Sequence, residues 1–324
     1  MGGVFVLGMH RSGTSAVTRL ISFLGFSTPE GQDLVPPSDK NPKGYWESMS
    51  LVALNERVLG AVGSDMGCPL PFTTGWEKDP RLDGMREPSL RSFQAAFPKE
   101  PWVWKDPRNC LTLAFWRSVL TVLPAVVLVH RNPLEIAASS LRLRHEEGKI
   151  YVLALWERYL RLALRELEDV PVLITSYGEL LAQPIAWCEQ TGLFLAQTGL
   201  PVHKHREEDV LSFVDRDLRH GEFSRADFLD DEDVSENQKE LFLALERMEG
   251  DHQRFSPPVL AAETPTTEAL LAERRRTLQV KHELSGMLEV ERESRRWSRV
   301  RTSPYVAPAR RVYANVRRLR RDKP

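Results

Sequence analysis

The first residues that could do chemistry lie in a glycine-bounded loop near the N-terminus, from Gly8 to Gly13. A short apolar run from Val4 to Leu7 precedes this loop, and apolar residues at helical spacing follow it from Thr14 onward. Glycines let a backbone close tightly around an anion, and the start of a helix supplies free N–H groups and the positive end of its dipole. The loop therefore predicts a binding site for a phosphate or a similar anion.

The residue after Gly13 indicates which class of anion fits this loop. The spacing from Gly8 to Gly13 equals that of the ATP-binding loop, but Thr14 stands where that loop has lysine. Enzymes of nucleoside triphosphates use the lysine on the β- and γ-phosphates and the next hydroxyl on magnesium. Here the positive charge lies inside the loop at Arg11. This arrangement favours an anion that is bound without magnesium.

A second candidate anion site follows the apolar run from Ala125 to Val129. Arg131 comes directly after this run, at the edge of the sheet where open α/β folds bind ligands, and Ser139 follows eight residues later. A guanidinium fork suits a phosphate dianion, and the Ser139 hydroxyl can reach the same oxygens. A local ion pair between Arg131 and Glu135 is the alternative, and the residues alone leave both interpretations open.

The elements that must position these residues alternate along the chain. Alternating strands and helices predict an α/β fold with a P-loop-like, doubly wound parallel sheet that is flanked by helices. We expect one domain over residues 1–255, a linker over 256–267, and a charged helix with a basic tail over 268–324. The expected strands are Val4–Leu7, Trp102–Trp104, Ala125–Val129 and Val170–Thr175; helices are expected from Thr14, over 50–59 and 111–120, from Pro133 with Asn132 as N-cap, and over 151–167.

Composition excludes several classes of protein. The chain has 324 residues and a formal net charge of −1, so no overall field selects nucleic acid. Its three cysteines fit neither a disulfide framework nor a zinc site, and we expect a reducing cytoplasm and no metal. The most apolar stretch, 111–129, contains Arg117 and Pro124, so we expect a buried helix and a buried strand there rather than a membrane span.

Both anion motifs together resemble the superfamily of sulfotransferases that use 3′-phosphoadenosine-5′-phosphosulfate (PAPS). The greatest similarity is to a bacterial branch with three segments, which stand here at His10–Ser15, Gly44–Glu47 and Lys105–Arg108. The resemblance covers about residues 3–250 and implies transfer of a sulfuryl group from PAPS to a hydroxyl, with adenosine 3′,5′-bisphosphate (PAP) as product and no metal.

The resemblance also implies roles for individual residues. Glu47 is expected to be the general base, with Glu30 and His10 as reserve candidates, and Lys105 and Arg11 to stabilise the transferring group. The alternative for Lys105 is a structural pairing with Asp106 or another acid, and Arg108 is expected to be structural. The residues expected to bind the donor are Arg11, Ser12, Gly13, Thr14 and Ser15 at the 5′-phosphosulfate, Arg131 and Ser139 at the 3′-phosphate, and Tyr177 near the adenosine.

Acceptor and partners are predicted less directly. The family analogy and the basic tail suggest a glycan or glycolipid hydroxyl as acceptor. Residues 268–324 could lie on an anionic membrane surface at the inner face of the membrane, or they could be a solvated tail that aids homo-oligomerisation. Two other functions stay open, namely a P-loop kinase of a small metabolite and a non-catalytic PAP-binding protein.

Overall fold

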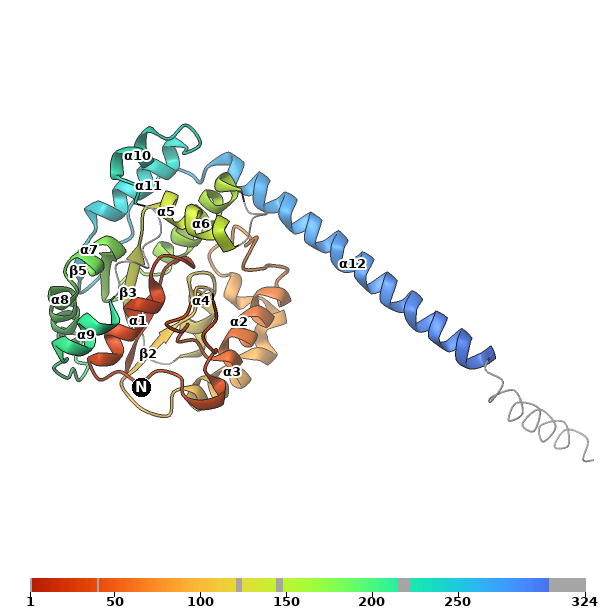
Figure 1. Cartoon of the computed structure of the whole chain (residues 1–324), viewed down its shortest axis with the longest axis horizontal. Coiled ribbons are helices and arrows are strands. Elements are labelled where there is room, and N and C mark those ends of the chain that lie inside the picture. Colours follow the sequence, from red (N-terminus) through yellow and green to blue (C-terminus); the bar gives the residue numbers. More distant parts are fainter. Residues whose placement is uncertain (1, 40, 121–123, 144–147, 215–221, 303–324) are drawn as a thin grey trace, which may run out of the picture. The chain divides into compact units, whose positions relative to one another are not determined.

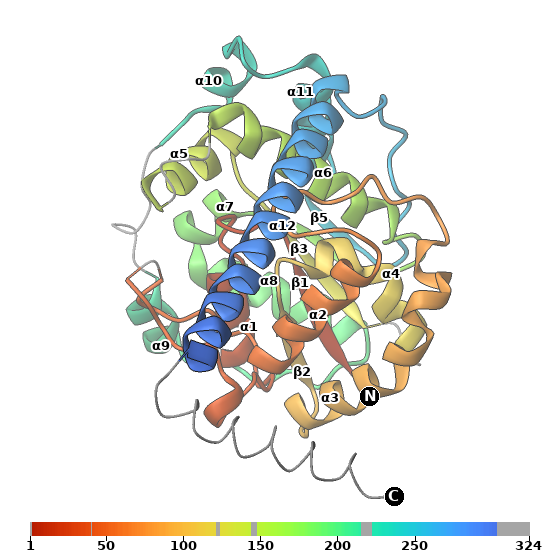
Figure 2. The same ribbon diagram turned by 90° about the vertical axis from the view of Figure 1, so that its right-hand side faces the viewer.

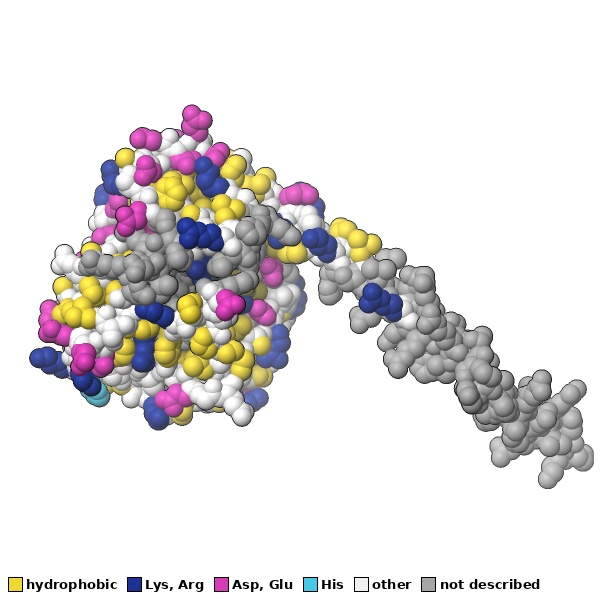
Figure 3. Space-filling view, in the orientation of Figure 1, with side chains coloured by type: hydrophobic (Ala, Val, Ile, Leu, Met, Phe, Trp, Pro, Cys, Tyr) yellow, Lys and Arg dark blue, Asp and Glu magenta, His cyan; other side chains and the backbone are white. Residues whose placement is uncertain are grey.

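The structure is a computed structural model that describes residues 2–39, 41–120, 124–143, 148–214 and 222–302. Its contacts divide the chain into two compact units, Met1–Ala272 and Glu273–Pro324. In the first unit, acidic, basic and apolar side chains are interspersed over the face shown in Figure 3. This mixture agrees with the formal net charge of −1.

The core of the first unit is a five-stranded sheet in the order β2-β1-β3-β4-β5. The first four strands in this order are parallel, which confirms the expected α/β class, and only β5 is antiparallel. The parallel strands read as apolar runs because both of their faces are buried. The strands are β1 (Gly3–Leu7), β2 (Trp102–Lys105), β3 (Ala125–His130), β4 (Val172–Ser176) and β5 (Gly250–His252).

Helices cover both faces of this sheet, as expected for a doubly wound fold (Figure 1). The face with Phe5 and Leu7 packs on α2, α3, α4, α6 and α11, whereas the face with Val4 and Val6 packs on α1, α7, α8 and α9. Within the first group, α2 and α3 lie side by side (Figure 2). The helices are α1 (Thr14–Phe23), α2 (Met49–Ala61), α3 (Arg86–Ala96), α4 (Asn109–Val119), α5 (Pro133–Leu143), α6 (Lys149–Arg165), α7 (Tyr177–Ala182), α8 (Pro184–Gln197), α9 (Glu207–Phe213), α10 (Arg225–Asp230), α11 (Glu236–Arg247) and α12 (Pro265–Thr302), with 3-10 turns at Gly31–Asp33, Trp76–Lys78 and Pro80–Met85.

The stretch 111–129 is a buried helix followed by a buried strand, as expected, because α4 ends at Val119 and β3 begins at Ala125. Among the described residues, no helix is long and apolar enough to cross a membrane. Asn132 caps α5 as predicted, since its side-chain oxygen accepts a hydrogen bond of 3.0 Å from the backbone N–H of Leu134.

Residues 256–264 contain no regular element, yet they are bound to α6. Arg158 on α6 is 1% exposed and donates hydrogen bonds to Glu263 and to Glu268 in the first turn of α12. The helix begins at Pro265, three residues before its expected start at Glu268. The arginines of the basic tail after Thr302 lie outside the described residues.

The parallel strands bring the predicted motifs to one edge of the sheet. The loop from Gly8 to Gly13 follows β1, Lys105 ends β2, Arg131 follows β3, and Tyr177 follows β4. Because carboxyl ends of parallel strands meet at the same edge, segments far apart in sequence can form one site there.

Candidate functional site

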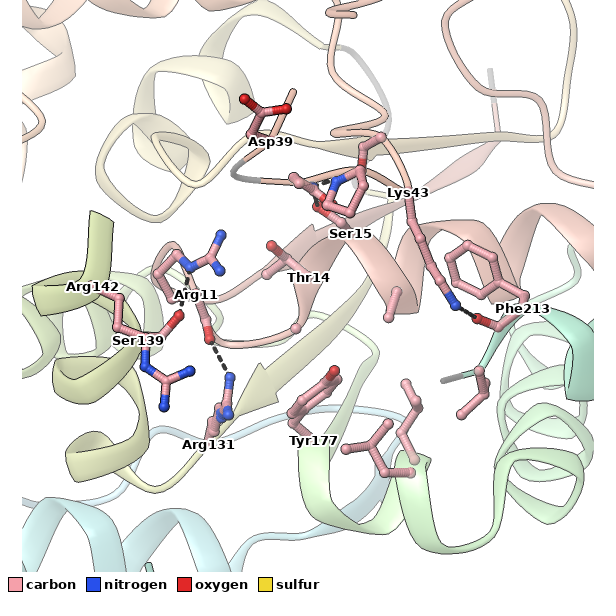
Figure 4. A pocket seen from close by; sticks show the side chains of 18 residues that line it. Arg11, Thr14, Ser15, Asp39, Lys43, Arg131, Ser139, Arg142, Tyr177 and Phe213 are labelled. Atoms are coloured by element: carbon pink, nitrogen blue, oxygen red, sulfur yellow. Dashed lines mark hydrogen bonds between the residues drawn. The ribbon is translucent and has the colours of Figure 1, made fainter. Parts of the chain in front are cut away.

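A cavity of about 300 Å³ lies at this edge of the sheet (Figure 4). Its wall is formed by the start of α1, by Asp39 and residues 41–44, by α5, and by α7 and α9. Seven of the predicted donor-binding residues line it, and they come from four separate segments: Arg11, Gly13, Thr14, Ser15, Arg131, Ser139 and Tyr177.

The loop before α1 has the geometry of an anion site. Gly13 is the N-cap of α1 and has a φ of 93°, and no side chain caps the helix there. No acidic residue lies in the first turn of α1, so its N–H groups and dipole are not compensated by a carboxylate of that turn. A Cβ atom on Gly13 would lie 2.1 Å from Cδ2 of Tyr177, so only glycine allows this approach.

Arg11 is held in a strained backbone conformation inside this loop. Its φ of 71° lies in the left-handed region, which is uncommon for a residue other than glycine. Its Nε donates a hydrogen bond of 2.9 Å to Oγ of Ser139 on α5. Burial, and then the positive charge of Arg131, lower the pKa of Arg11. Two guanidinium groups are thus held near each other, an arrangement that an anion between them would stabilise.

Arg131 forms the local ion pair with Glu135, one of the two interpretations that the sequence left open. Its Nε donates to Oε2 of Glu135 at 2.6 Å, and its Nη1 donates to the backbone oxygen of Arg11 at 3.1 Å. Its guanidinium carbon lies 4.9 Å from the centre of the Tyr177 ring. The buried Nη2 atom has no hydrogen-bond partner in the part of the chain that the structure describes. A buried donor of this kind needs an acceptor, which a bound anion can supply.

The segment before α2 closes another side of the cavity. Asn41 donates hydrogen bonds to Oγ of Ser15 at 3.2 Å and to the backbone oxygen of Gly44 at 2.7 Å. Lys43 donates to the backbone oxygen of Phe213 at the end of α9, at 2.5 Å. These contacts tie the segment 41–44 to α1 and α9, and Lys43 and Phe213 both line the cavity.

Glu47 and Lys105 contact each other directly. The Nζ atom of Lys105 donates a short hydrogen bond to Oε1 of Glu47, and the side chains are 2% and 11% exposed. Burial raises the pKa of Glu47, whereas the charge of Lys105 acts in the opposite direction. Lys105 therefore has an acidic partner, and this partner is the proposed base Glu47 itself. Neither residue is among those that line the cavity.

A buried polar network holds the loop after Lys105. Asn55 of α2 donates to Asp106 and to Asn109, both at 2.9 Å, and its oxygen accepts hydrogen bonds from Thr112 and Trp116. Arg108 binds Asp106 at 3.1 Å and Glu56 at 2.6 Å. The network fixes α2, which starts just after Glu47, against the loop that starts just after Lys105.

Three other predicted residues do not line the cavity. Ser12 is 1% exposed and does not line the cavity. Glu30 is exposed and lies 3.6 Å from Lys99, and His10 meets the ring of Tyr159 edge-on at 6.0 Å. Arg142, Lys43 and Phe213 also line the cavity, and we did not predict them from the sequence. The sequence did contain an indication for Arg142, because it follows Ser139 by three residues on the same predicted helix and so lies on the same helix face.

The described residues contain no cluster of three or more His, Cys, Asp and Glu side chains that could hold a metal ion.

Neither a known protein family nor a curated protein matches the sequence significantly. Among solved structures, the chain is similar to the sulfotransferase domain from the Synechococcus PCC 7002 olefin synthase. That similarity has 16% identity and a TM-score of 0.41, and it covers 84% of this chain and 94% of that one. The sulfotransferase domain from the curacin biosynthetic pathway is similar at 15% identity and a TM-score of 0.41, with 84% and 97% of the two chains covered.

Proposed function

We propose that this chain is a sulfotransferase that moves a sulfuryl group from PAPS to an acceptor hydroxyl. One observation carries the proposal: a single cavity is lined both by the uncapped loop at the start of α1 and by Arg131 and Ser139. The nucleotide donor has two anionic groups, one on each side of a ribose, and so requires two anion sites in one cavity.

The residues present fit such a donor. The N–H groups at the start of α1 and Arg11 can bind the 5′-phosphosulfate, and Ser139 with the unsatisfied Nη2 of Arg131 can bind the 3′-phosphate. The rest of the wall includes the apolar side chains of Leu180, Leu181 and Phe213, which suit an adenine ring.

The buried ion pair supplies the residues for the transfer itself. When bound, PAPS provides the sulfuryl group, whose bond to the acceptor oxygen forms as its bond to the phosphate oxygen breaks. Glu47 accepts the proton of the acceptor hydroxyl, because burial raises its pKa toward the range of an effective base. Lys105 and Arg11 stabilise the negative charge on the leaving phosphate oxygen. Lys105 must then turn partly from Glu47 to that oxygen, which leaves the carboxylate ready to take the proton.

Thr14 weighs against the kinase alternative, because it replaces the lysine that a nucleoside-triphosphate site requires. In addition, β3 is followed by Arg131 rather than by a carboxylate that could bind magnesium. A non-catalytic PAP-binding protein is the second candidate, and one observation favours it: Glu47 is paired with Lys105 and does not line the cavity. Turnover distinguishes it from the enzyme.

Transfer from radiolabelled PAPS to glycan and glycolipid acceptors tests the proposal. Glu47→Gln should lower the transfer rate by about 10²- to 10⁴-fold, the usual contribution of a general base, and should keep PAP binding. Glu30→Gln is the matched control, because Glu30 is exposed and outside the cavity wall. Unchanged transfer by Glu47→Gln would contradict Glu47 as base, and PAP binding without transfer to any acceptor would favour the non-catalytic protein.

The glycan or glycolipid acceptor and the membrane contact of residues 268–324 are further parts of the proposal, and they rest on composition. Co-sedimentation of the whole chain with anionic and with neutral vesicles tests the contact. Basic residues predict preferential pelleting with anionic vesicles. Equal pelleting with both kinds of vesicle would contradict it.

A further inference from the structure

Arg142 is a third arginine on the wall of the cavity. It lies on α5 three residues after Ser139, and residues at this spacing share one face of a helix. Figure 4 shows its side chain extending from α5 toward Arg131, beside Ser139, while Arg11 lies on the other side of Ser139. Within the described part of the chain, no carboxylate forms an ion pair with Arg142.

The corner around Ser139 has an excess of positive charge. Arg11, Arg131 and Arg142 line it, and Glu135 binds Arg131 at 2.6 Å. Asp39 also lines the cavity, but it belongs to the segment on the opposite wall (Figure 4). A phosphate monoester, with a charge of about −1.5 to −2 at neutral pH, has the charge to interact with several arginines at once.

Arg131 and Arg142 differ in their burial and in their hydrogen bonds to the rest of the protein. Arg131 is buried, and its hydrogen bonds to Glu135 and to the backbone of Arg11 are part of the folded structure. Arg142 is exposed at the rim of the cavity, and no hydrogen bond of it joins another described residue. Its guanidinium is therefore available to a ligand, and its loss should leave the fold intact.

We propose that Arg142 binds the 3′-phosphate of the donor and determines the preference for a nucleotide that carries this phosphate over one that lacks it. This inference rests on the proposed function. Its position on α5 beside Ser139 and Arg131 assigns Arg142 to the 3′ group, because the N–H groups for the 5′ group belong to α1. Arg142 thus acts as a specificity-determining residue for the donor.

Isothermal titration of the full chain with PAP and with adenosine 5′-monophosphate, at one ionic strength, tests this role. Arg142→Ala should weaken PAP binding by about 10- to 100-fold, the worth of a charge-assisted contact, and should weaken monophosphate binding by less than about twofold. Arg142→Lys should fall between, because it keeps the charge and loses the planar fork. Arg254→Ala is the control, since Arg254 is 80% exposed and pairs with Asp169 away from the cavity; it should change neither affinity.

The outcomes separate this inference from the proposed function. A wild-type chain that binds PAP no more tightly than the monophosphate overturns both. A wild-type preference for PAP that Arg142→Ala retains overturns only the role of Arg142. Equal weakening of both ligands by Arg142→Ala also overturns it, because the arginine would then act on the 5′ group or through its general field. An unchanged melting temperature of Arg142→Ala would show that a loss of affinity is not a loss of fold.

Discussion

Lys105 at the end of β2 donates a hydrogen bond to Glu47, which lies 58 residues earlier, just before α2. Counted over the whole residue, Lys105 is 2% exposed and Glu47 is 8% exposed, so solvent has almost no access to this ion pair. Each charge compensates the other at a position where water cannot hydrate either of them. The pair connects the proposed base to the loop that we propose binds the donor, because Lys105 pairs in the sheet with Val6 of β1, two residues before Gly8.

Removal of Lys105 should destabilise the protein in a pH-dependent way. Burial raises the pKa of Glu47 above its ordinary value of 4.5, and without Lys105 it should rise further. The stability that Glu47 contributes through this raised pKa is therefore fully present below about pH 4.5. It is lost as the pH rises through the pKa of Glu47 in the folded protein. We expect Lys105→Met to lose about 3–5 kcal/mol near pH 8, the usual cost of breaking a buried pair, and less near pH 5. Urea unfolding at both pH values measures this.

The double variant Glu47→Gln with Lys105→Met controls for the change in shape. It removes both charges, so it should recover most of the stability that Lys105→Met loses near pH 8. An equal loss by Lys105→Met at both pH values would contradict a charged Glu47 that is buried beside Lys105.

Asn55 should tolerate no acidic replacement. Its amide donates to Asp106, and both residues are fully buried. Asn55→Asp would place two carboxylates together and remove the donor, so we expect a loss of more than about 3 kcal/mol near neutral pH. Denaturant titration measures it, with Arg57→Ala as the control because Arg57 is exposed on the same helix. Similar small losses by both variants would contradict the network.

The strands and the two anion motifs could be predicted from the sequence. A parallel strand buried on both faces is a continuous apolar run, and a loop such as Gly8–Gly13 has local spacing that depends on no distant residue. The pairing of Glu47 with Lys105 could not be predicted, because it depends on how α2 packs on the loop after β2. The short strand β5 was missed for a similar reason: Gly-Asp-His has no strand pattern, and its pairing with β4 determines it.

The three cysteines should be unreactive in the folded protein. All three are buried, and burial raises the pKa of Cys110 and of Cys188 to about 12. The thiolate is the reactive form, so iodoacetamide near pH 8 should modify none of them until urea is added. Mass spectrometry of the labelled protein measures this. Rapid labelling of Cys110, whose Sγ accepts a hydrogen bond of 3.2 Å from the N–H of Gly8, would contradict the packing of the loop.

Gly13→Ala should abolish nucleotide binding. The added Cβ would lie 2.1 Å from the ring of Tyr177, so the loop or the tyrosine must move out of the cavity wall. Gly63→Ala is the matched control: Gly63 also has a positive φ, of 76°, but no atom lies within 4 Å of its added Cβ. We expect both variants to lose about 1 kcal/mol from the strained backbone, and only Gly13→Ala to lose PAP affinity. Calorimetric titration and thermal unfolding separate the two effects, and PAP binding by Gly13→Ala at wild-type affinity would contradict the loop as donor site.

Isothermal titration with PAP in the absence of magnesium, beside ATP with magnesium, tests the central claim most directly. The two proposed anion sites predict micromolar or tighter binding of PAP, a binding free energy of about −8 kcal/mol. Arg131→Ala should weaken this binding. Ser139→Ala should also weaken it, and this variant leaves the ion pair of Arg131 with Glu135 intact. Binding of ATP with magnesium and none of PAP would contradict the sulfotransferase proposal and favour a kinase.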